Sequence, residues 1–192
     1  NGNWPRYLMN SAMVTVITVV ISLIINSMSG FVFARIPFRG RGVLFALVLL
    51  GMMIPPEVTL FPVFKLVRSV PFAGGNDWRG AGGTGLMNTY AGLILPFIAG
   101  SFGVFLCRQF YVGFPAELDD AALIDGCGRF RQFVRIYLPL SGPVLASLGI
   151  LKFTGTWNEY TWPLVLTSGD AMKTVQLALS TFRSEAETIW TQ

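Results

Sequence analysis

The chain contains no histidine and only two cysteines, Cys107 and Cys127, among its 192 residues. It therefore lacks an imidazole base, a histidine metal ligand and a Cys-x-x-Cys pair. Charged residues are also scarce, at 12% of the chain against about 25% in a typical soluble domain. Because 53% of the residues are hydrophobic, too little polar surface is left to coat a water-soluble globule. The composition predicts a membrane protein with no catalytic residues and no metal site.

The sequence also lacks the motifs for binding ATP and nucleic acid. No Gly-x-x-x-x-Gly-Lys-Ser/Thr sequence occurs, so the chain does not itself hold ATP in a P-loop. The net charge is only +4, and no basic stretch with interleaved aromatic residues is present. We therefore expect no cofactor bound by this chain and no nucleic-acid partner.

Long uncharged runs are what the chain has in abundance. No charged residue occurs from Tyr7 to Ala34, which exceeds the about 20 residues that a membrane helix needs. Further apolar runs are interrupted only by Glu57, Lys152 and Glu159. Because a backbone in lipid must satisfy its own hydrogen bonds, each run should be helical. The sequence predicts an all-α, polytopic transmembrane helix bundle, a single domain with spans at about 9–33, 42–66, 89–110 and 141–166.

The distribution of basic residues and the chain ends give weaker expectations. Residues 35–41 and 108–138 contain seven arginines, whereas the other loops contain six basic residues. Because basic residues are enriched in cytoplasmic loops, this small excess favours a cytoplasmic position for residues 35–41 and 108–138. The chain begins at Asn1 without a signal peptide and ends at Gln192 in a polar stretch. We therefore expect it to be truncated at both ends.

The polar segment between the third and fourth predicted spans reads Phe-Pro-Ala-Glu-Leu-Asp-Asp-Ala-Ala-Leu-Ile-Asp-Gly, from Phe114 to Gly126. Pro115 suits a first helical turn, and the acidic residues after it suit the positive end of a helix dipole. Gly126 suits a left-handed C-cap. These signals predict a short amphipathic helix over 115–125, outside the membrane. Its alanine face would either approach another protein closely or pack on its own bundle or on lipid.

Two longer patterns resemble a known family. Asp120-Ala121-Ala122, Gly126 and residues 136–139 (Ile-Tyr-Leu-Pro) fit Glu-Ala-Ala-x3-Gly-x9-Ile-x-Leu-Pro, the signature of ABC importer permeases, with Asp120 in place of glutamate. Residues 156–164 (Thr-Trp-Asn-Glu-Tyr-Thr-Trp-Pro-Leu) resemble the carbohydrate, or maltose-type, branch. Shorter matches at residues 10–11, 33–35 and 53–55 extend the resemblance over most of the chain. The sequence thus resembles the binding-protein-dependent transport inner-membrane component family.

The resemblance implies a pore-forming permease subunit of an ATP-driven importer for a sugar or sugar-like solute, in a prokaryotic cell membrane, without enzyme activity of its own. Its partners would be an ABC ATPase dimer that binds ATP, a second permease subunit, an extracytoplasmic solute-binding protein and membrane lipid. Relatives usually have six spans, of which this chain would hold the second to the fifth. Residues 114–139 would form the cytoplasmic coupling loop. The coupling residues would be Glu117, Asp120, Ala121, Ala122, Asp125, Gly126 and Pro139.

The solute pathway is predicted from polar groups inside the spans. Buried charges in a membrane are costly and usually functional or paired, and Glu57 and Lys152 lie at similar predicted depths. They would either neutralise one another or both line the pathway. The candidate pathway residues are Glu57, Lys152, Thr156, Trp157, Asn158 and Glu159. In the alternative function, a secondary transporter or ion channel, Glu57 and Lys152 would relay protons or ions, but that reading leaves the coupling signature unexplained.

Overall fold

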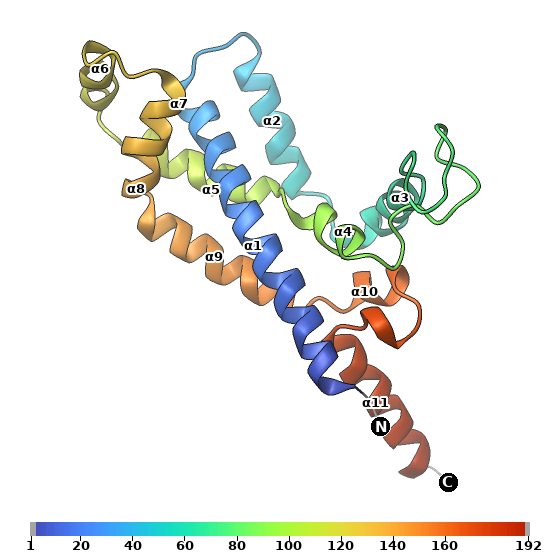
Figure 1. The fold of residues 1–192 in the computed structure, drawn as a ribbon. Coiled ribbons are helices and arrows are strands. Elements are labelled where there is room, and N and C mark those ends of the chain that lie inside the picture. Colours follow the sequence, from blue (N-terminus) through green and yellow to red (C-terminus); the bar gives the residue numbers. More distant parts are fainter. Residues whose placement is uncertain (1–2, 191–192) are drawn as a thin grey trace. The chain divides into compact units, whose positions relative to one another are not determined.

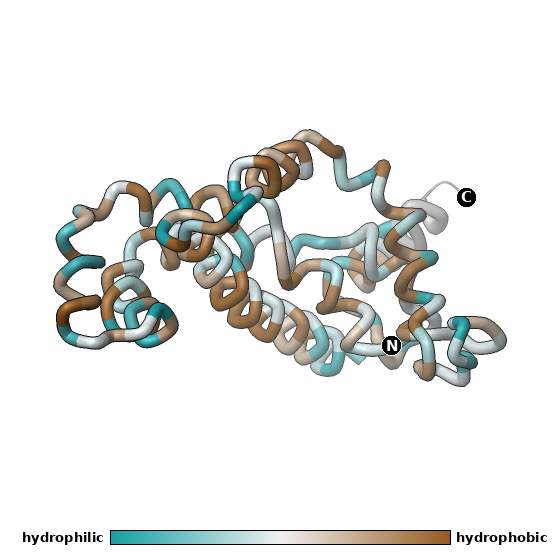
Figure 2. Tube along the Cα trace, turned by 90° about the horizontal axis from the view of Figure 1, so that it is seen from above, coloured by the Kyte–Doolittle hydropathy of each residue, from teal (hydrophilic) through white to brown (hydrophobic). Residues whose placement is uncertain are grey.

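The computed structural model describes residues 3–190, with side chains for residues 3–183. Every regular element in that part of the chain is a helix (Figure 1), which confirms the predicted all-α class. Apolar residues predominate along the helical parts of the trace (Figure 2). The chain divides into two compact units, which we call the first unit (Asn1–Thr18, Pro55–Phe97 and Phe153–Gln192) and the second unit (Val19–Ile54 and Ile98–Lys152).

One helix, α1 (Trp4–Arg35), is by itself long and apolar enough to cross a membrane. Three further candidates qualify only if two bent, consecutive segments are counted as one span, so the described residues hold between one and four spans. These pairs are α2 (Arg41–Met52) with α3 (Pro56–Arg68), Tyr90–Phe97 with α5 (Ser101–Val112), and Arg129–Leu140 with α9 (Gly142–Trp157). The four predicted spans stay a prediction.

The helix breaks follow from proline and glycine. Pro56 occupies the first turn of α3 and Pro55 is its extended N-cap, so the helix that ends at Met52 cannot run through them. Gly100, with extended backbone, precedes α5. The last predicted span is also interrupted, because α9 ends at Trp157 and a separate helix, α10 (Thr161–Leu166), follows. Proline thus accounts for the break between α2 and α3.

The second unit is held together by an aromatic cluster and a polar spine. Its buried cluster consists of Phe31, Cys107, Tyr111, Phe133, Tyr137 and Leu148. Along α1, Asn26 donates to Ser22 Oγ at 2.8 Å, and the Ser27 hydroxyl lies 2.6 Å from the Tyr111 hydroxyl. A Cβ at Gly30 would lie 2.5 Å from Cys107 Cβ, so only glycine permits this approach of α1 and α5. Close contact through small residues and side-chain hydrogen bonds is typical of membrane helix packing.

The second unit also contains the polar segment that follows α5. Its helices are α6 (Glu117–Ile124), α7 (Arg129–Gln132), η2 (Phe133–Tyr137) and α8 (Leu138–Leu140). The η2 element is a π-helical turn, a geometry that occurs frequently at functional sites.

The first unit joins the first half of α1 to short helices from later in the chain. These are α3, α4 (Tyr90–Ile94), η1 (Leu95–Phe97), α10, η3 (Asp170–Met172) and α11 (Val175–Trp190). Asn10 donates to the carbonyls of Ala171 at 3.1 Å and Lys173 at 2.9 Å, and it accepts from Tyr90 at 2.6 Å. The buried Asn76 organises the glycine-rich loop 69–89 by donating to the Arg68 carbonyl at 2.8 Å.

Candidate functional site

The short helix predicted over residues 115–125 is present as α6 (Figure 1). Its first turn carries Glu117, Asp119 and Asp120, as the dipole argument required. Its end is set by Gly126, whose φ of 67° lies in the left-handed region. The Cys127 amide donates to the Ala122 carbonyl at 2.8 Å, which is the long bond of a Schellman-type end. Proline, acid and glycine signals therefore located this helix to within two residues.

Asp119 is the side chain that fixes α6 to the rest of the second unit. Its Oδ2 atom lies 3.1 Å from Arg35 Nη1, and the two side chains are only 16% and 10% exposed. Its Oδ1 atom accepts from the Tyr137 hydroxyl at 2.8 Å and from Gln132 Nε2. Gln132 and Tyr137 are fully buried. Both carboxylate oxygens are therefore occupied by donors from three different parts of the second unit.

Arg35, the last residue of α1, is the counterpart of Asp119. Its Nε and Nη2 atoms donate to the Tyr111 carbonyl at 3.0 Å and 2.7 Å, and Nη2 also donates to the Phe114 carbonyl. Its guanidinium carbon lies 5.5 Å from the centre of the Tyr137 ring. One planar, permanently charged group thus joins α1, the end of α5, α6 and η2. We call Arg35, Asp119, Gln132 and Tyr137 the Arg35–Asp119 clamp.

Sequence reasoning missed this clamp. Arg35 was noted only for its positive charge and in a short family match, and Asp119 stands immediately before the signature. A fixed acid beside the signature and an arginine at the end of a span were the available signals.

Six of the seven predicted coupling residues are exposed, and Ala122 is the exception. Ala122 is 3% exposed and packs inward, so it can affect a partner only through the packing of α6. The other predicted coupling residues, Glu117, Asp120, Ala121, Asp125, Gly126 and Pro139, are exposed. Leu123 and Ile124 are exposed as well, Ile124 to 86%. The free face therefore combines carboxylates with two apolar side chains that the prediction did not include.

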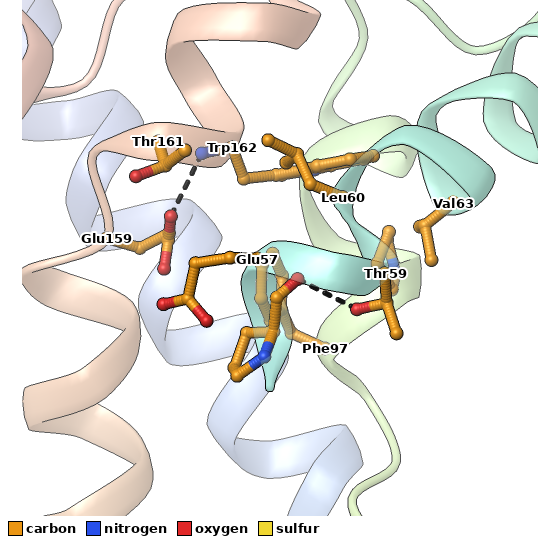
Figure 3. Close-up of a pocket in the computed structure, with 10 residues that line it drawn as sticks. Glu57, Thr59, Leu60, Val63, Phe97, Glu159, Thr161 and Trp162 are labelled. Atoms are coloured by element: carbon orange, nitrogen blue, oxygen red, sulfur yellow. Dashed lines mark hydrogen bonds between the residues drawn. The ribbon is translucent and has the colours of Figure 1, made fainter. Parts of the chain in front are cut away.

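A cavity of about 190 Å³ lies in the first unit (Figure 3). It brings together Glu57, at the start of α3, and Glu159, in the turn before α10, whose carboxyl groups face the same end of the cavity (Figure 3). The remaining lining residues are Pro56, Thr59, Leu60, Val63, Pro96, Phe97, Thr161 and Trp162. Two of the predicted solute residues thus share one site.

The aromatic wall of this cavity is rigidly held. Trp162 is buried, and its indole Nε1 donates to the Gly92 carbonyl at 3.0 Å. Its ring contacts Phe97 edge to face, with the ring centres 6.3 Å apart. Glu159 Oε1 accepts from the Trp162 amide at 2.9 Å, which satisfies a free N–H at the start of α10. Trp162 is therefore part of the interior of the first unit.

The other predicted pathway residues lie nearby in the chain but outside this cavity. Thr156 and Trp157 line a second hollow of about 10 Å³, and Trp157 stacks on Phe153 with ring centres 5.7 Å apart. Asn158 donates to the Thr154 carbonyl at 2.9 Å and accepts from Gln176 at 3.0 Å. Lys152 belongs to the second unit and Glu57 to the first. Their pairing therefore stays a prediction.

The all-helical fold, the apolar α1 and the signature segment together point to one family of membrane proteins. The chain belongs to the family described as binding-protein-dependent transport system inner membrane component, which matches residues 27–189. This confirms the family that the sequence patterns indicated.

Similar proteins include several bacterial permeases. The arabinooligosaccharides transport system permease protein AraQ of Halalkalibacterium halodurans is 40% identical over 172 residues, which cover 90% of this chain and 57% of AraQ. The sn-glycerol-3-phosphate transport system permease protein UgpE of Agrobacterium fabrum is 35% identical over 189 residues, covering 96% of this chain and 61% of UgpE. The chain therefore spans less than two thirds of the length of these relatives.

A solved structure supports the fold independently. It is the crystal structure of a bacterial ABC transporter involved in the import of the acidic polysaccharide alginate, and it matches with a TM-score of 0.79. The match covers 92% of this chain and 57% of the other, at 24% sequence identity. At that identity the similarity establishes the shared fold.

Proposed function

We propose that this chain forms part of the translocation pore of an ABC importer for a sugar or sugar-like solute in a prokaryotic cell membrane. The observation that carries the proposal is the Arg35–Asp119 clamp, which anchors a solvent-exposed helix, α6, to the end of the membrane-length helix α1. Family membership and the names of relatives such as the arabinooligosaccharides permease support the solute class.

In this proposal α6 is the surface on which a separate ATPase subunit docks. Its exposed face offers the carboxylates of Glu117, Asp120 and Asp125 around the apolar Leu123 and Ile124. That arrangement resembles an interface with an apolar centre and a polar rim. An ATPase that prefers one permease conformation shifts the equilibrium by its differential affinity. Because Asp119 ties α6 to Arg35, displacement of α6 acts directly on the end of α1.

The same proposal gives each subunit of the importer a separate role. The ATPase dimer binds and hydrolyses ATP, a second permease subunit completes the pore, and an extracytoplasmic protein delivers the solute. This chain contributes helices and the docking surface and has no ATPase activity. Membrane lipid covers the exposed apolar residues of α1, such as Val16, Val20 and Ile24.

The proposal is tested by replacing Ile124 with Asp in the full-length permease and purifying it with its ATPase. A carboxylate at the centre of the apolar contact should release the ATPase or abolish solute-stimulated ATP hydrolysis, while the permease still reaches the membrane. The matched control is Phe72→Asp, because Phe72 is an equally exposed apolar residue, at 82%, in loop 69–89 of the other unit.

Two results would count against this function. An Ile124→Asp permease that binds the ATPase as well as the control does would show that α6 is not the docking surface. Solute uptake driven by an ion gradient without ATP would instead support the secondary transporter.

A further inference from the structure

We infer that the cavity of the first unit is a solute subsite that accepts an uncharged or ammonium-bearing, hydroxyl-rich ring and rejects solutes bearing phosphate or carboxylate. The inference rests on the proposed transport function and adds the class of solute to it. It is carried by the groups that line the cavity.

The charge of the cavity wall is of one sign. Glu57 and Glu159 line it, and none of the ten lining residues is Lys or Arg. Glu57 makes no hydrogen bond or ion pair among the described residues, and Glu159 uses one oxygen on the Trp162 amide. Carboxylate oxygens accept hydrogen bonds, so they suit hydroxyl and ammonium donors. They repel a phosphate or carboxylate most strongly where water is partly excluded.

The rest of the wall suits a ring. Ligand sites are typically apolar and aromatic with a few convergent polar groups. Trp162 and Phe97 supply the apolar side, and the hydrogen bond from Trp162 to the Gly92 carbonyl keeps the indole from rotating. Thr59 and Thr161 supply hydroxyl groups.

The size of the cavity limits what it holds. Its 190 Å³ is below the range of about 300–1,000 Å³ that encloses a drug-sized ligand. The cavity therefore takes one ring of a longer solute, or a single small sugar, at a time.

The experiment measures the charge preference of a thiol placed inside the cavity. Thr161, which is exposed and lines the cavity, is changed to Cys in the full-length, detergent-solubilised transporter with Cys127 replaced by Ser. Cys107 is wholly buried and can stay. The thiol is reacted with a methanethiosulfonate bearing trimethylammonium and with one bearing sulfonate. We expect the ratio of the cationic to the anionic rate to exceed that of free glutathione by about tenfold, a factor worth about 1.4 kcal/mol.

The same Cys in a Glu57→Gln, Glu159→Gln background is the matched comparison, and there the ratio should fall to the glutathione value. Asp170→Asn is the control, because Asp170 is an exposed carboxylate of the same unit that pairs with Lys173 at 2.7 Å and does not line the cavity. It should leave the ratio unchanged.

A protection assay then links the charge to the solute. Arabinotriose, glucosamine and sn-glycerol 3-phosphate are added at equal concentration before labelling. Arabinotriose or glucosamine should slow the reaction, and glycerol phosphate should not. Four results would each overturn the subsite. The labelling results are equal cationic and anionic rates, or a ratio that persists after both glutamates are changed to glutamine. The protection results are stronger protection by glycerol phosphate, or no protection by any of the three solutes. All four outcomes leave ATPase binding through α6 intact, so they are distinct from a failure of the proposed function.

Discussion

The carboxylates of the two units have opposite surroundings. In the second unit, both oxygens of Asp119 are taken up by Arg35, Gln132 and Tyr137. In the first unit, Glu57 has no such partner among the described residues, and Glu159 uses a single oxygen on a backbone amide. A carboxylate whose two oxygens both accept hydrogen bonds holds its helix in place. A carboxylate with an oxygen free in a cavity remains available to a ligand. Under the proposed function, we therefore expect coupling to depend on the second unit and solute contact on the first.

The largest expected effect comes from removing the arginine that pairs with Asp119. Changing Arg35 to Ala leaves Asp119 charged and nearly buried without its cation, which should destabilise the permease by about 3–5 kcal/mol. The double change Arg35→Ala, Asp119→Ala should cost less than the sum of the single changes, because it leaves no charge stranded. Thermal unfolding of the detergent-solubilised, full-length permease measures both. Strictly additive losses would mean that the two residues do not act as a pair.

How far the sequence predicts these two regions depends on the range of the interaction. The start and end of α6 are set by neighbours in the chain, Glu117 and Gly126, so they could be predicted. The partner of Asp119 is 84 residues away, and no spacing rule relates it to Arg35. The burial of Ala122 could not be predicted either, because an apolar stripe does not reveal which of its residues the rest of the chain covers.

The first unit was harder to predict for a related reason. Glu57 and Glu159 were each noticed as costly charges within apolar runs. Their meeting in one cavity depends on how α3 packs beside α10 and η1, which is a property of the fold. Trp162 lines the same cavity, and the carbonyl that its indole N–H binds belongs to Gly92, 70 residues away in the chain.

A second, smaller effect is expected where α6 ends. Gly126 has φ of 67°, and a Cβ there would meet no atom of the described residues within 4 Å, so the cost of a side chain is a backbone cost. Gly126→Val should cost about 1–2 kcal/mol and weaken ATPase binding, and Gly126→Asn should cost less. Gly128→Val is a matched control, because Gly128 is equally uncrowded but has φ of −63°. The ATPase retained per permease on affinity purification is the measurement. A Gly128 variant that lost as much ATPase would refute the conformational explanation.

The smallest effect separates the two roles of Glu159. Its Oε1 atom satisfies the Trp162 amide at the start of α10, and its charge contributes to the cavity. Glu159→Gln keeps an acceptor oxygen and removes the charge, whereas Glu159→Ala removes both. Loss of a helix-start bond of this kind costs about 1 kcal/mol, so the melting temperature should fall by about 2–4 °C in the Ala variant and little in the Gln variant. Both variants should lower the ratio of cationic to anionic labelling at Thr161→Cys to the same extent. If the Gln variant kept the full ratio, the preference would come from Glu57 alone. If Ala and Gln were equally stable, the Trp162 amide would not depend on Glu159, and the carboxylate would be as free as that of Glu57.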